Sequence, residues 1–378
     1  MTVSLYWSAL PQYRIPVFRE LDRRPGIVLK VRHSEFPGIE NVPADGFDAC
    51  FSPVHTTPVG GLLWTRAHSL LVADEPDVAV IEWNVRFLPL MPTILRLRHR
   101  GVGVVLWGHG YSKTPSRARR RLRLAAGRAA HVVVLYDRST AEALVTEAGF
   151  KPKRVFVAPN TIDQRAIRLA RSKLEAAPGE LERFRAQHHL STPTVLFVSR
   201  LIPDNRVDVL LDGIAELKRR GTEARCVVLG SGPSLEALMR RTSDLGLDGL
   251  VTFLPATYDE DELAPWFMSA DIFCYPSNAG LSVLHSFAYG LPVLVGDDRT
   301  RHNPEIDSVK GGVNGLMFEH DNSASLAASL EGILTDGELR GRLQRGAFET
   351  AKRYSLEGMI DGLESAIRVA FELVRGRS

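Results

Sequence analysis

The chain has 378 residues, which predicts two domains because single domains usually hold about 100 to 150 residues. Hydrophobic residues make up 44% and charged residues 24%, an ordinary globular composition that excludes a mainly disordered or fibrous chain. The formal net charge of +3 is too small to indicate a protein that coats itself with nucleic acid. Any anion binding must therefore come from local clusters of basic residues.

Short apolar runs alternate with helix-length segments along the chain, a pattern that predicts parallel sheets with helical crossovers. A charged, apolar-poor stretch after Ala158 is interpreted as a connection between two successive α/β domains. In the first half, the predicted strands are 3–7, 27–31, 77–83, 103–109 and 131–136, with a helix over 16–23. In the second half, they are 194–200, 225–232, 251–255, 271–277, 291–297 and 315–319, with helices over 207–220 and 234–246.

The cysteines and the apolar runs indicate a cytoplasmic protein. Cys50, Cys226 and Cys274 are widely spaced and odd in number, which is typical of neither a disulfide framework nor a metal site. The N-terminus lacks a signal-peptide pattern, and no apolar run reaches the ~18 residues of a membrane-spanning helix. We therefore expect a chain that neither crosses a membrane nor is secreted.

The segment 275–298 is the most informative, because a strand there ends in a small-residue turn and a helix begins near Leu281. Ligands of open parallel sheets bind beyond the carboxyl ends of the strands. Amides at a helix start lack intrahelical partners, so Gly280, Leu281 and Ser282 are candidates for binding a diphosphate. His285 lies one turn later, within reach of a ribose; the alternative is that Ser282 caps the helix and His285 is merely packed.

Five motifs in order resemble those of the retaining GT-B glycosyltransferases of family 4, the glycosyl transferases group 1. GLSVLHSFAYGLPVLV is similar to the phosphate and ribose segment of that family, and the others are VAPNTID, VSRLIPDNRVDVLL, VVLGSGP and PEIDSVKGGVNGLMF. The resemblance implies the GT-B fold, an α/β architecture of two Rossmann-like domains that face a central cleft. The N-terminal, acceptor-binding domain would span 1–175 together with a returning helix over about 356–378, and the nucleotide-sugar-binding domain would span 190–355.

The resemblance also assigns roles in donor binding. Arg200 stands where the family grips the donor diphosphate, and a fixed cation there would stabilise the leaving group; the alternative is a surface arginine at a strand end. Asn205 stands in place of a lysine, with Arg206 beside it either as a substitute or as an exposed cation at a helix start. The two glutamates of the family, eight residues apart, are both missing, and His285 stands where the second would be.

Three further residues are assigned to the site. Glu305 matches a glutamate that opens a helix in the donor pocket, although Asn-Pro-Glu is also an ordinary helix start. Gly230 lies in the VVLGSGP motif, and the resemblance assigns it to the donor site; the strand end there lacks the full G-x-G-x-x-G spacing, which argues against dinucleotide binding. His109, between two glycines after an apolar strand, resembles the residue that meets the transferred sugar. The other histidines show no metal spacing, and no metal is expected.

Two segments of the first half are candidates for acceptor binding. PQYRIPVFREL, near the end of the first strand, makes Tyr13 and Arg14 candidates for the acceptor pocket. SKTPSRARRRLRLAAGRAAH predicts a basic helix that lies on an anionic membrane surface or holds a lipid-linked acceptor, the alternative being a solvated helix face. Its arginines are Arg117, Arg119, Arg120, Arg121, Arg123 and Arg128.

The resemblance therefore implies a metal-independent, retaining glycosyltransferase without a cofactor. It would move a sugar from a nucleotide-diphosphate sugar to a glycan or lipid-linked glycan, in bacterial surface polysaccharide or glycoconjugate biosynthesis, with Arg200 and His109 as catalytic residues. A peripheral position on the inner face of the membrane is expected, and no nucleic-acid partner. The alternatives are a non-catalytic relative that binds a nucleotide sugar or glycan, motivated by the missing glutamates, and a nucleotide-sugar epimerase.

Overall fold

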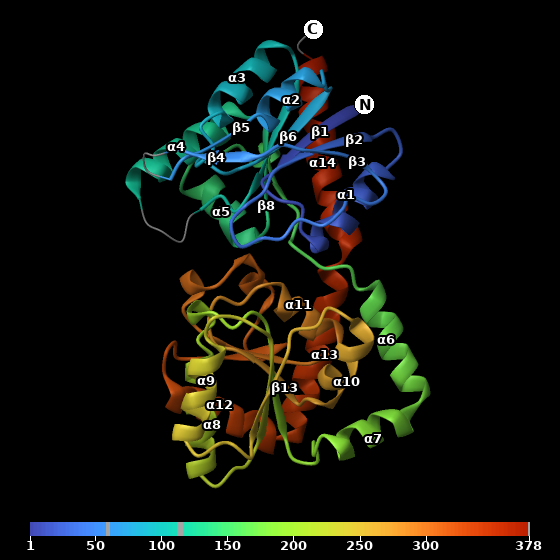
Figure 1. Ribbon diagram of the computed structural model, residues 1–378. Coiled ribbons are helices and arrows are strands. Elements are labelled where there is room, and N and C mark those ends of the chain that lie inside the picture. The colour runs from blue at the N-terminus through green and yellow to red at the C-terminus, as the bar shows by residue number, and fades with distance from the viewer. Residues whose placement is uncertain (58–60, 112–115, 377–378) are drawn as a thin grey trace. The chain divides into compact units, whose positions relative to one another are not determined.

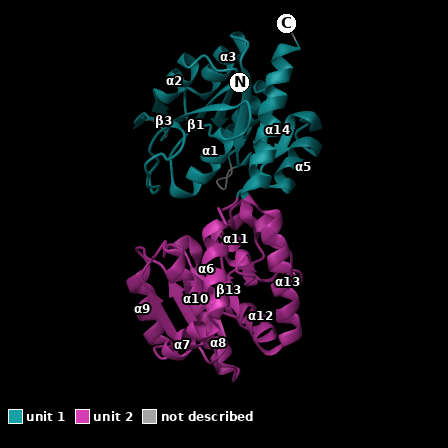
Figure 2. Cartoon of the chain, turned by 90° about the vertical axis from the view of Figure 1, so that its right-hand side faces the viewer, with its two compact units in different colours: residues 1–160, 356–378 teal, residues 161–355 magenta. Residues whose placement is uncertain are grey.

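The computed structural model describes residues 1–57, 61–111 and 116–376 (Figure 1). The chain forms two compact units, shown in teal and magenta in Figure 2. Unit 1 comprises Met1–Asn160 and Leu356–Ser378, and unit 2 comprises Thr161–Ser355. Each unit has a parallel sheet and α-helices, so the predicted α/β fold with two Rossmann-like domains is confirmed.

Unit 1 is built on a seven-stranded parallel sheet of order β3-β2-β1-β6-β7-β8-β9. The strand order reverses between β1 and β6, so the loops that follow these two strands flank a topological switch point. The strands are β1 (Thr2–Trp7), β2 (Val28–His33), β3 (Asp48–Phe51), β6 (Val78–Glu82), β7 (Gly103–Gly108), β8 (Val132–Leu135) and β9 (Val155–Val157), and β4 (Val54–Thr56) pairs with β5 (Leu63–Thr65). The helices are α1 (Ile15–Asp22), α2 (Ala67–Ala73), α3 (Leu90–His99), α4 (Arg117–Ala129), α5 (Arg138–Thr146) and α14 (Leu356–Arg375), with 3-10 turns η1 (Gln12–Arg14) and η2 (Pro152–Arg154).

The C-terminal helix α14 packs against β7, β8, β9 and α1 of unit 1. Its buried residues follow the period of a helix, so one apolar face lies on the sheet. Gly362 allows the close approach, because a Cβ there would come within 2.4 Å of the Val157 carbonyl oxygen. The strands β7 and β8 are buried along their whole length, which explains their continuous apolar sequences.

Unit 2 is built on a six-stranded parallel sheet of order β12-β11-β10-β13-β14-β15. The order reverses between β10 and β13, which makes a second switch point. The strands are β10 (Thr194–Val198), β11 (Arg225–Leu229), β12 (Val251–Leu254), β13 (Ile272–Tyr275), β14 (Val293–Gly296) and β15 (Gly315–Phe318). The helices are α6 (Arg165–Ala176), α7 (Pro178–Gln187), α8 (Val207–Arg219), α9 (Leu235–Asp244), α10 (Glu260–Ser269), α11 (Leu281–Ala288), α12 (Ser323–Thr335) and α13 (Gly337–Arg353), with 3-10 turns η3 (Pro203–Asn205), η4 (Arg299–Arg301) and η5 (Pro304–Ser308).

The stretch predicted to connect the domains is instead helical and belongs to unit 2. Ile167 of α6 is buried in the core of that unit, and Lys173 Nζ lies 2.7 Å from the Asp261 carboxylate. Arg185 of α7 donates to the carbonyl of Met268 at 2.8 Å. These contacts move the boundary of the first unit from the predicted residue 175 back to Asn160. Among the described residues, no helix is both long enough and apolar enough to span a membrane.

Candidate functional site

The loops after β10 and β13 of unit 2 leave the sheet on either side of its switch point, and three asparagines link them to each other and to the segment before η5. The side-chain amide of Asn205 is buried and donates to the carbonyl of Arg200 at 2.6 Å. Asn278 donates its side-chain amide to Asn205 Oδ1 at 2.8 Å, and Asn303 donates to the Asn278 carbonyl at 2.9 Å. Asn205 therefore shapes the site by holding its two loops together, beyond the strand ends where such sheets bind ligands.

The helix α11 begins directly after the second of these loops. Its N-cap is Gly280, which has no side chain to accept a hydrogen bond from the first turn, so Ser282 is not the cap. The preceding turn is fixed, because the Ala279 amide donates to His302 Nδ1 at 3.1 Å. The amides of Leu281 and Ser282 thus open a helix whose positive dipole end is not met by a capping side chain.

The charges of Arg200 and Glu305 both affect the pKa of one tyrosine, Tyr275, at this edge of the sheet. Arg200 is exposed after β10, whereas Glu305 is buried in η5. Tyr275 ends β13, and its hydroxyl hydrogen-bonds with Ser199 Oγ at 2.8 Å. Burial raises the pKa of Tyr275 to about 12, while the charge of Arg200 lowers it and that of Glu305 raises it. The structure therefore brings the predicted residues Arg200 and Glu305 to the same end of the sheet.

His285 has a carboxylate partner that the sequence analysis missed. Its Nε2 lies 2.9 Å from Oε1 of Glu260, the first residue of α10, and its ring stacks on Phe267 with centroids 4.6 Å apart. Burial alone would raise the pKa of Glu260, but the hydrogen bond and charge of His285, with the Tyr289 hydroxyl, hold that pKa below its ordinary value. His285 is thus both packed, as the alternative stated, and joined to an ionised carboxylate. The only signal in the sequence was an acidic run, Asp259–Glu262.

Gly230 allows the loop that carries Arg200 to pack closely against the end of β11. A Cβ at Gly230 would lie 1.9 Å from the carbonyl oxygen of Ser199, and one at Gly232 would lie 2.4 Å from that of Leu201. Only glycine lets these backbones come so close. Gly230 therefore positions the loop that carries Arg200, and its own contact with a donor stays a prediction.

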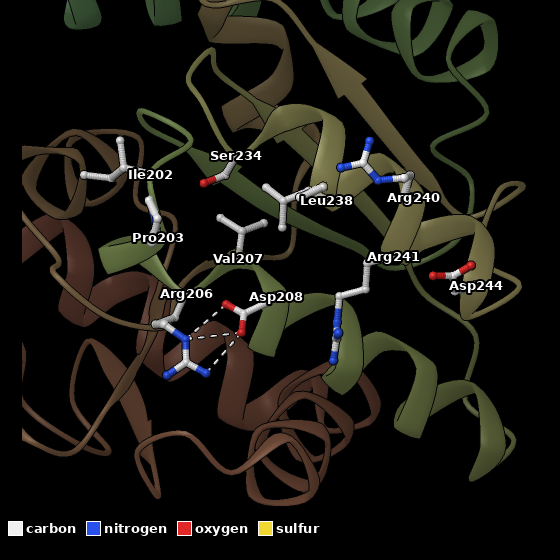
Figure 3. Close-up of a pocket in the computed structure, with 11 residues that line it drawn as sticks. Ile202, Pro203, Arg206, Val207, Asp208, Ser234, Leu238, Arg240, Arg241 and Asp244 are labelled. Carbon is white, nitrogen blue, oxygen red and sulfur yellow. Dashed lines mark hydrogen bonds and ion pairs between the residues drawn. The ribbon is translucent and has the colours of Figure 1, made fainter.

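Arg206 lies in the wall of a separate pocket of about 570 Å³, formed by α8, α9 and the turns that precede them (Figure 3). Its guanidinium forms ion pairs with Asp208, at 3.1 Å, and with Asp321. The Asp208 hydrogen bond raises the pKa of Arg206 further above its usual range. Leu281 and Ser282 are not among the residues that line this pocket. That Arg206 binds the diphosphate stays a prediction. To do so, its guanidinium would have to leave Asp208 and Asp321 and pair with the phosphate oxygens instead.

In unit 1, His109 and Arg14 lie at the carboxyl end of the sheet. His109 is exposed directly after β7, and its ring centroid is 5.0 Å from that of Tyr136. Arg14 is buried and donates Nη2 to the Tyr136 hydroxyl at 2.8 Å. The structure therefore brings His109 and Arg14 to one tyrosine at the ligand-binding end of this fold.

The predicted basic helix is α4, which contains no acidic residue. Arg123 is half-buried, and burial together with the charge of Arg119 lowers its pKa. The arginines gather in the first turns, where the positive end of the helix dipole disfavours cations. Residues 112–115 of the predicted segment lie outside the described residues. The exposed members are Arg117, Arg119, Arg120, Arg121 and Arg128.

Across residues 1–57, 61–111 and 116–376, no group of three or more histidine, cysteine, aspartate or glutamate side chains is placed to hold a metal ion.

Residues 192–336 match the family model described as "Glycosyl transferases group 1". A D-inositol 3-phosphate glycosyltransferase of Frankia alni is 29% identical over 331 residues, which cover 81% of this chain and 74% of the relative. A GDP-mannose-dependent alpha-(1-6)-phosphatidylinositol monomannoside mannosyltransferase of Mycolicibacterium smegmatis is 32% identical over 173 residues, 42% of this chain and 43% of the relative. For three further D-inositol 3-phosphate glycosyltransferases, the alignment spans 51% of the relative.

Solved structures share the fold over nearly the whole chain. Anabaena HepE in complex with UDP superposes with a TM-score of 0.73 at 17% identity, covering 97% of this chain and 99% of HepE. A glycosyltransferase from Rickettsia africae has a TM-score of 0.72 at 14% identity, covering 100% of this chain and 99% of that protein. The two Rossmann-like units and these matches define a glycosyltransferase with the GT-B fold. The part of the chain that matches the glycosyl transferases group 1 model, residues 192–336, lies within unit 2.

Proposed function

We propose that this glycosyltransferase takes a sugar from a nucleotide-diphosphate sugar bound by unit 2 and transfers it, with retention, to an acceptor bound by unit 1. The observation that carries the proposal is the uncapped start of α11, whose loop is tied through Asn278 and Asn205 to the backbone of Arg200. Helix-start amides and a guanidinium are the groups that bind a diphosphate without covalent chemistry.

The comparisons support a nucleotide-sugar donor. A relative is named GDP-mannose-dependent, and a neighbour of the same fold was solved with UDP-glucose. These names describe those proteins, and they do not identify the nucleotide or the sugar that this chain uses. Next to the proposed diphosphate position, His285 and Glu260 offer a nitrogen and a carboxylate oxygen to the hydroxyls of a ribose.

In the proposed reaction, the acceptor oxygen attacks the anomeric carbon on the face from which the diphosphate departs. The bond from the acceptor oxygen to the anomeric carbon forms as the bond to the phosphate oxygen breaks, and the departing phosphate takes the acceptor proton. Arg200 and the α11 amides stabilise the charge that develops on the diphosphate, by roughly 3 kcal/mol for a well-placed donor. The scheme needs neither a metal ion nor a cofactor. His109 meets the transferred sugar from unit 1, and Glu305 lines the donor pocket.

The exposed arginines of α4 support an anionic surface as a partner. Five exposed cations in one helix without an acidic residue are suited to the headgroups of an anionic membrane. A relative is named for a phosphatidylinositol monomannoside acceptor. We therefore propose a glycan or lipid-linked glycan as the acceptor, used in bacterial surface polysaccharide or glycoconjugate synthesis, with the protein at the inner face of the membrane.

The test is to incubate the full chain with UDP-, GDP-, ADP- and dTDP-sugars, with and without a bacterial glycolipid extract, and to measure release of the nucleoside diphosphate. We expect acceptor-dependent release from one donor, and a product whose anomeric proton coupling in NMR shows retention. Donor binding without turnover, with every acceptor tried, would favour the non-catalytic relative. Exchange of solvent deuterium into C2 of the donor sugar, without an acceptor, would instead favour an epimerase.

A further inference from the structure

Arg14 is a buried cation whose hydrogen-bonding capacity is mostly unused. The side chain is 3% exposed, and its guanidinium carbon lies 4.7 Å from the ring centroid of Trp7, 4.8 Å from that of Trp107 and 5.4 Å from that of Tyr136. Nη2 donates to the Tyr136 hydroxyl, but Nε and Nη1 have no hydrogen-bond partner in the part of the chain that the structure describes. Buried donors of this kind are normally satisfied, so these two nitrogens require an explanation.

A carboxyl group on a neighbouring strand, that of Glu82, interacts with the charge of Arg14, but the two form no ion pair among the described residues. Glu82 ends β6, and its Oε2 accepts the Ser8 amide at 2.7 Å. Burial raises the pKa of Glu82, while hydrogen bonds with Ser8 and Asn84 and, least of these, the charge of Arg14 lower it. None of the ion pairs found among the described residues includes Arg14. The aromatic rings stabilise the cation by cation–π contact but offer no acceptor to Nε or Nη1.

The position of Arg14 is the one where this fold binds ligands. Arg14 ends η1, directly after the loop that follows β1, and Glu82 ends the neighbouring β6. The sheet order reverses between these two strands, so Arg14 lies at the switch point of unit 1. The ring of Tyr13, 37% exposed, has its centroid 5.2 Å from the guanidinium carbon, so the cation lies one side chain from solvent.

A purely structural role does not require a charge here. An apolar side chain of similar length would fill the space between the rings, and such replacements of buried charges are often neutral or stabilising. A guanidinium instead matches the planar, two-oxygen edge of a phosphate or a carboxylate.

We propose that Arg14 is the anion-binding residue of unit 1 and that the acceptor carries a phosphate or carboxylate group, which pairs with Nε and Nη1. The statement that this ligand is the acceptor rests on the proposed function. The anion site itself rests on Arg14 alone and can be tested without a donor or turnover.

The test uses the full chain and two probes, inorganic phosphate and acetate, at constant ionic strength set by sodium chloride. Because two of the five tryptophans, Trp7 and Trp107, flank the guanidinium, a fluorescence change that the wild type shows and Arg14→Met lacks reports occupancy. We expect a saturable change in the millimolar range with one of the probes, and the stronger probe identifies the anion. In Arg14→Met, binding should weaken at least tenfold, whereas Arg23→Met, an exposed change at the end of α1, should leave it unchanged.

Thermal unfolding separates this role from a structural one. The stronger probe, at saturation, should raise the melting temperature of the wild type by about 2 to 4 °C and leave that of Arg14→Met unchanged. Arg14→Lys keeps a cation without the planar guanidinium and should bind that probe at least tenfold more weakly, whereas Tyr136→Phe should still bind it. Equal binding by wild type and Arg14→Met, or no saturable change in the wild type with either probe, would overturn the proposal. Failure of nucleotide-sugar binding would overturn the proposed function and leave the anion result standing.

Discussion

His285 Nε2 lies 2.9 Å from Glu260 Oε1, which joins the second turn of α11 to the first residue of α10. The contact places an ionised carboxylate one helical turn from the uncapped start of α11. The position where the resemblance indicated a missing glutamate is occupied by His285, and a carboxylate from another helix contacts it. The donor site proposed for unit 2 therefore has two parts, helix amides with Arg200 for the diphosphate and the His285–Glu260 pair for the ribose.

The pair predicts a loss of nucleotide affinity when either member is changed. His285→Ala and Glu260→Gln should each weaken binding of the nucleoside diphosphate about tenfold, since a lost hydrogen bond to a charged group is worth about 1.5 kcal/mol. Isothermal titration calorimetry measures this. Glu262→Gln, an exposed change on α10, is the control and should bind as tightly as the wild type. Unchanged affinity in His285→Ala would mean that the histidine only packs on Phe267.

Arg200→Ala should lower kcat/KM for sugar transfer about 10²- to 10³-fold, because a fixed donor for developing charge contributes roughly 3 kcal/mol. Circular dichroism and melting should stay unchanged, since the side chain is exposed. Arg342→Ala, an exposed change on α13, is the matched control and should transfer at the wild-type rate. A wild-type rate for Arg200→Ala would rule out its grip on the diphosphate.

The predicted strands correspond to β1, β2, β6, β7, β8 and to all six strands of the unit 2 sheet, whereas the short strands β3, β4, β5 and β9 were missed. The runs that form β7 and β8 are covered on both faces and therefore read as unbroken apolar sequence. The strand β3 was missed because this edge strand is largely exposed. The helices α6 and α7 were taken for a connection, since their few apolar residues pack only on one side, against α10.

Only those parts of the candidate site that are formed by one continuous segment of the chain could be predicted from the sequence. The start of α11 could be recognised from the turn before Leu281 and the helix after it. The contact between His285 and Glu260 could not, because it joins two helices and depends on how α10 packs against α11. The burial of Arg14 likewise depends on rings from β1, β7 and the end of β8 meeting around it.

Charge reversal on α4 tests the proposed membrane surface. Arg117→Glu, Arg120→Glu and Arg121→Glu together should abolish sedimentation with phosphatidylglycerol vesicles, since each basic residue near such a surface contributes about 1 kcal/mol. The control makes the same three reversals at exposed arginines of α13, Arg342, Arg345 and Arg353. Equal loss of binding in both variants would point to net charge rather than to α4.

Because His68 is buried, we expect the folding stability of unit 1 to fall at acidic pH. The histidine is buried in α2 beside Tyr6, and burial lowers its pKa to about 3. Between the ordinary value of 6.5 and about 3, the unfolded chain binds a proton that the folded chain does not, so stability falls as the pH falls. The free energy of unfolding should drop by about 1.4 kcal/mol per pH unit more in the wild type than in His68→Phe. Denaturant unfolding at pH 4 to 7 measures this, and the exposed change His99→Phe should keep the wild-type slope; an unchanged slope in His68→Phe would contradict the assignment.

If unit 2 binds a nucleotide-diphosphate sugar through Arg200 and the start of α11, the donor should stabilise the wild type more than Arg200→Ala. Thermal unfolding of both proteins with UDP-, GDP-, ADP- and dTDP-sugars at millimolar concentration measures this. One donor should raise the melting temperature of the wild type by several degrees, and Arg200→Ala should lose most of this shift. No shift with any donor, or an equal shift in both proteins, would contradict this proposal.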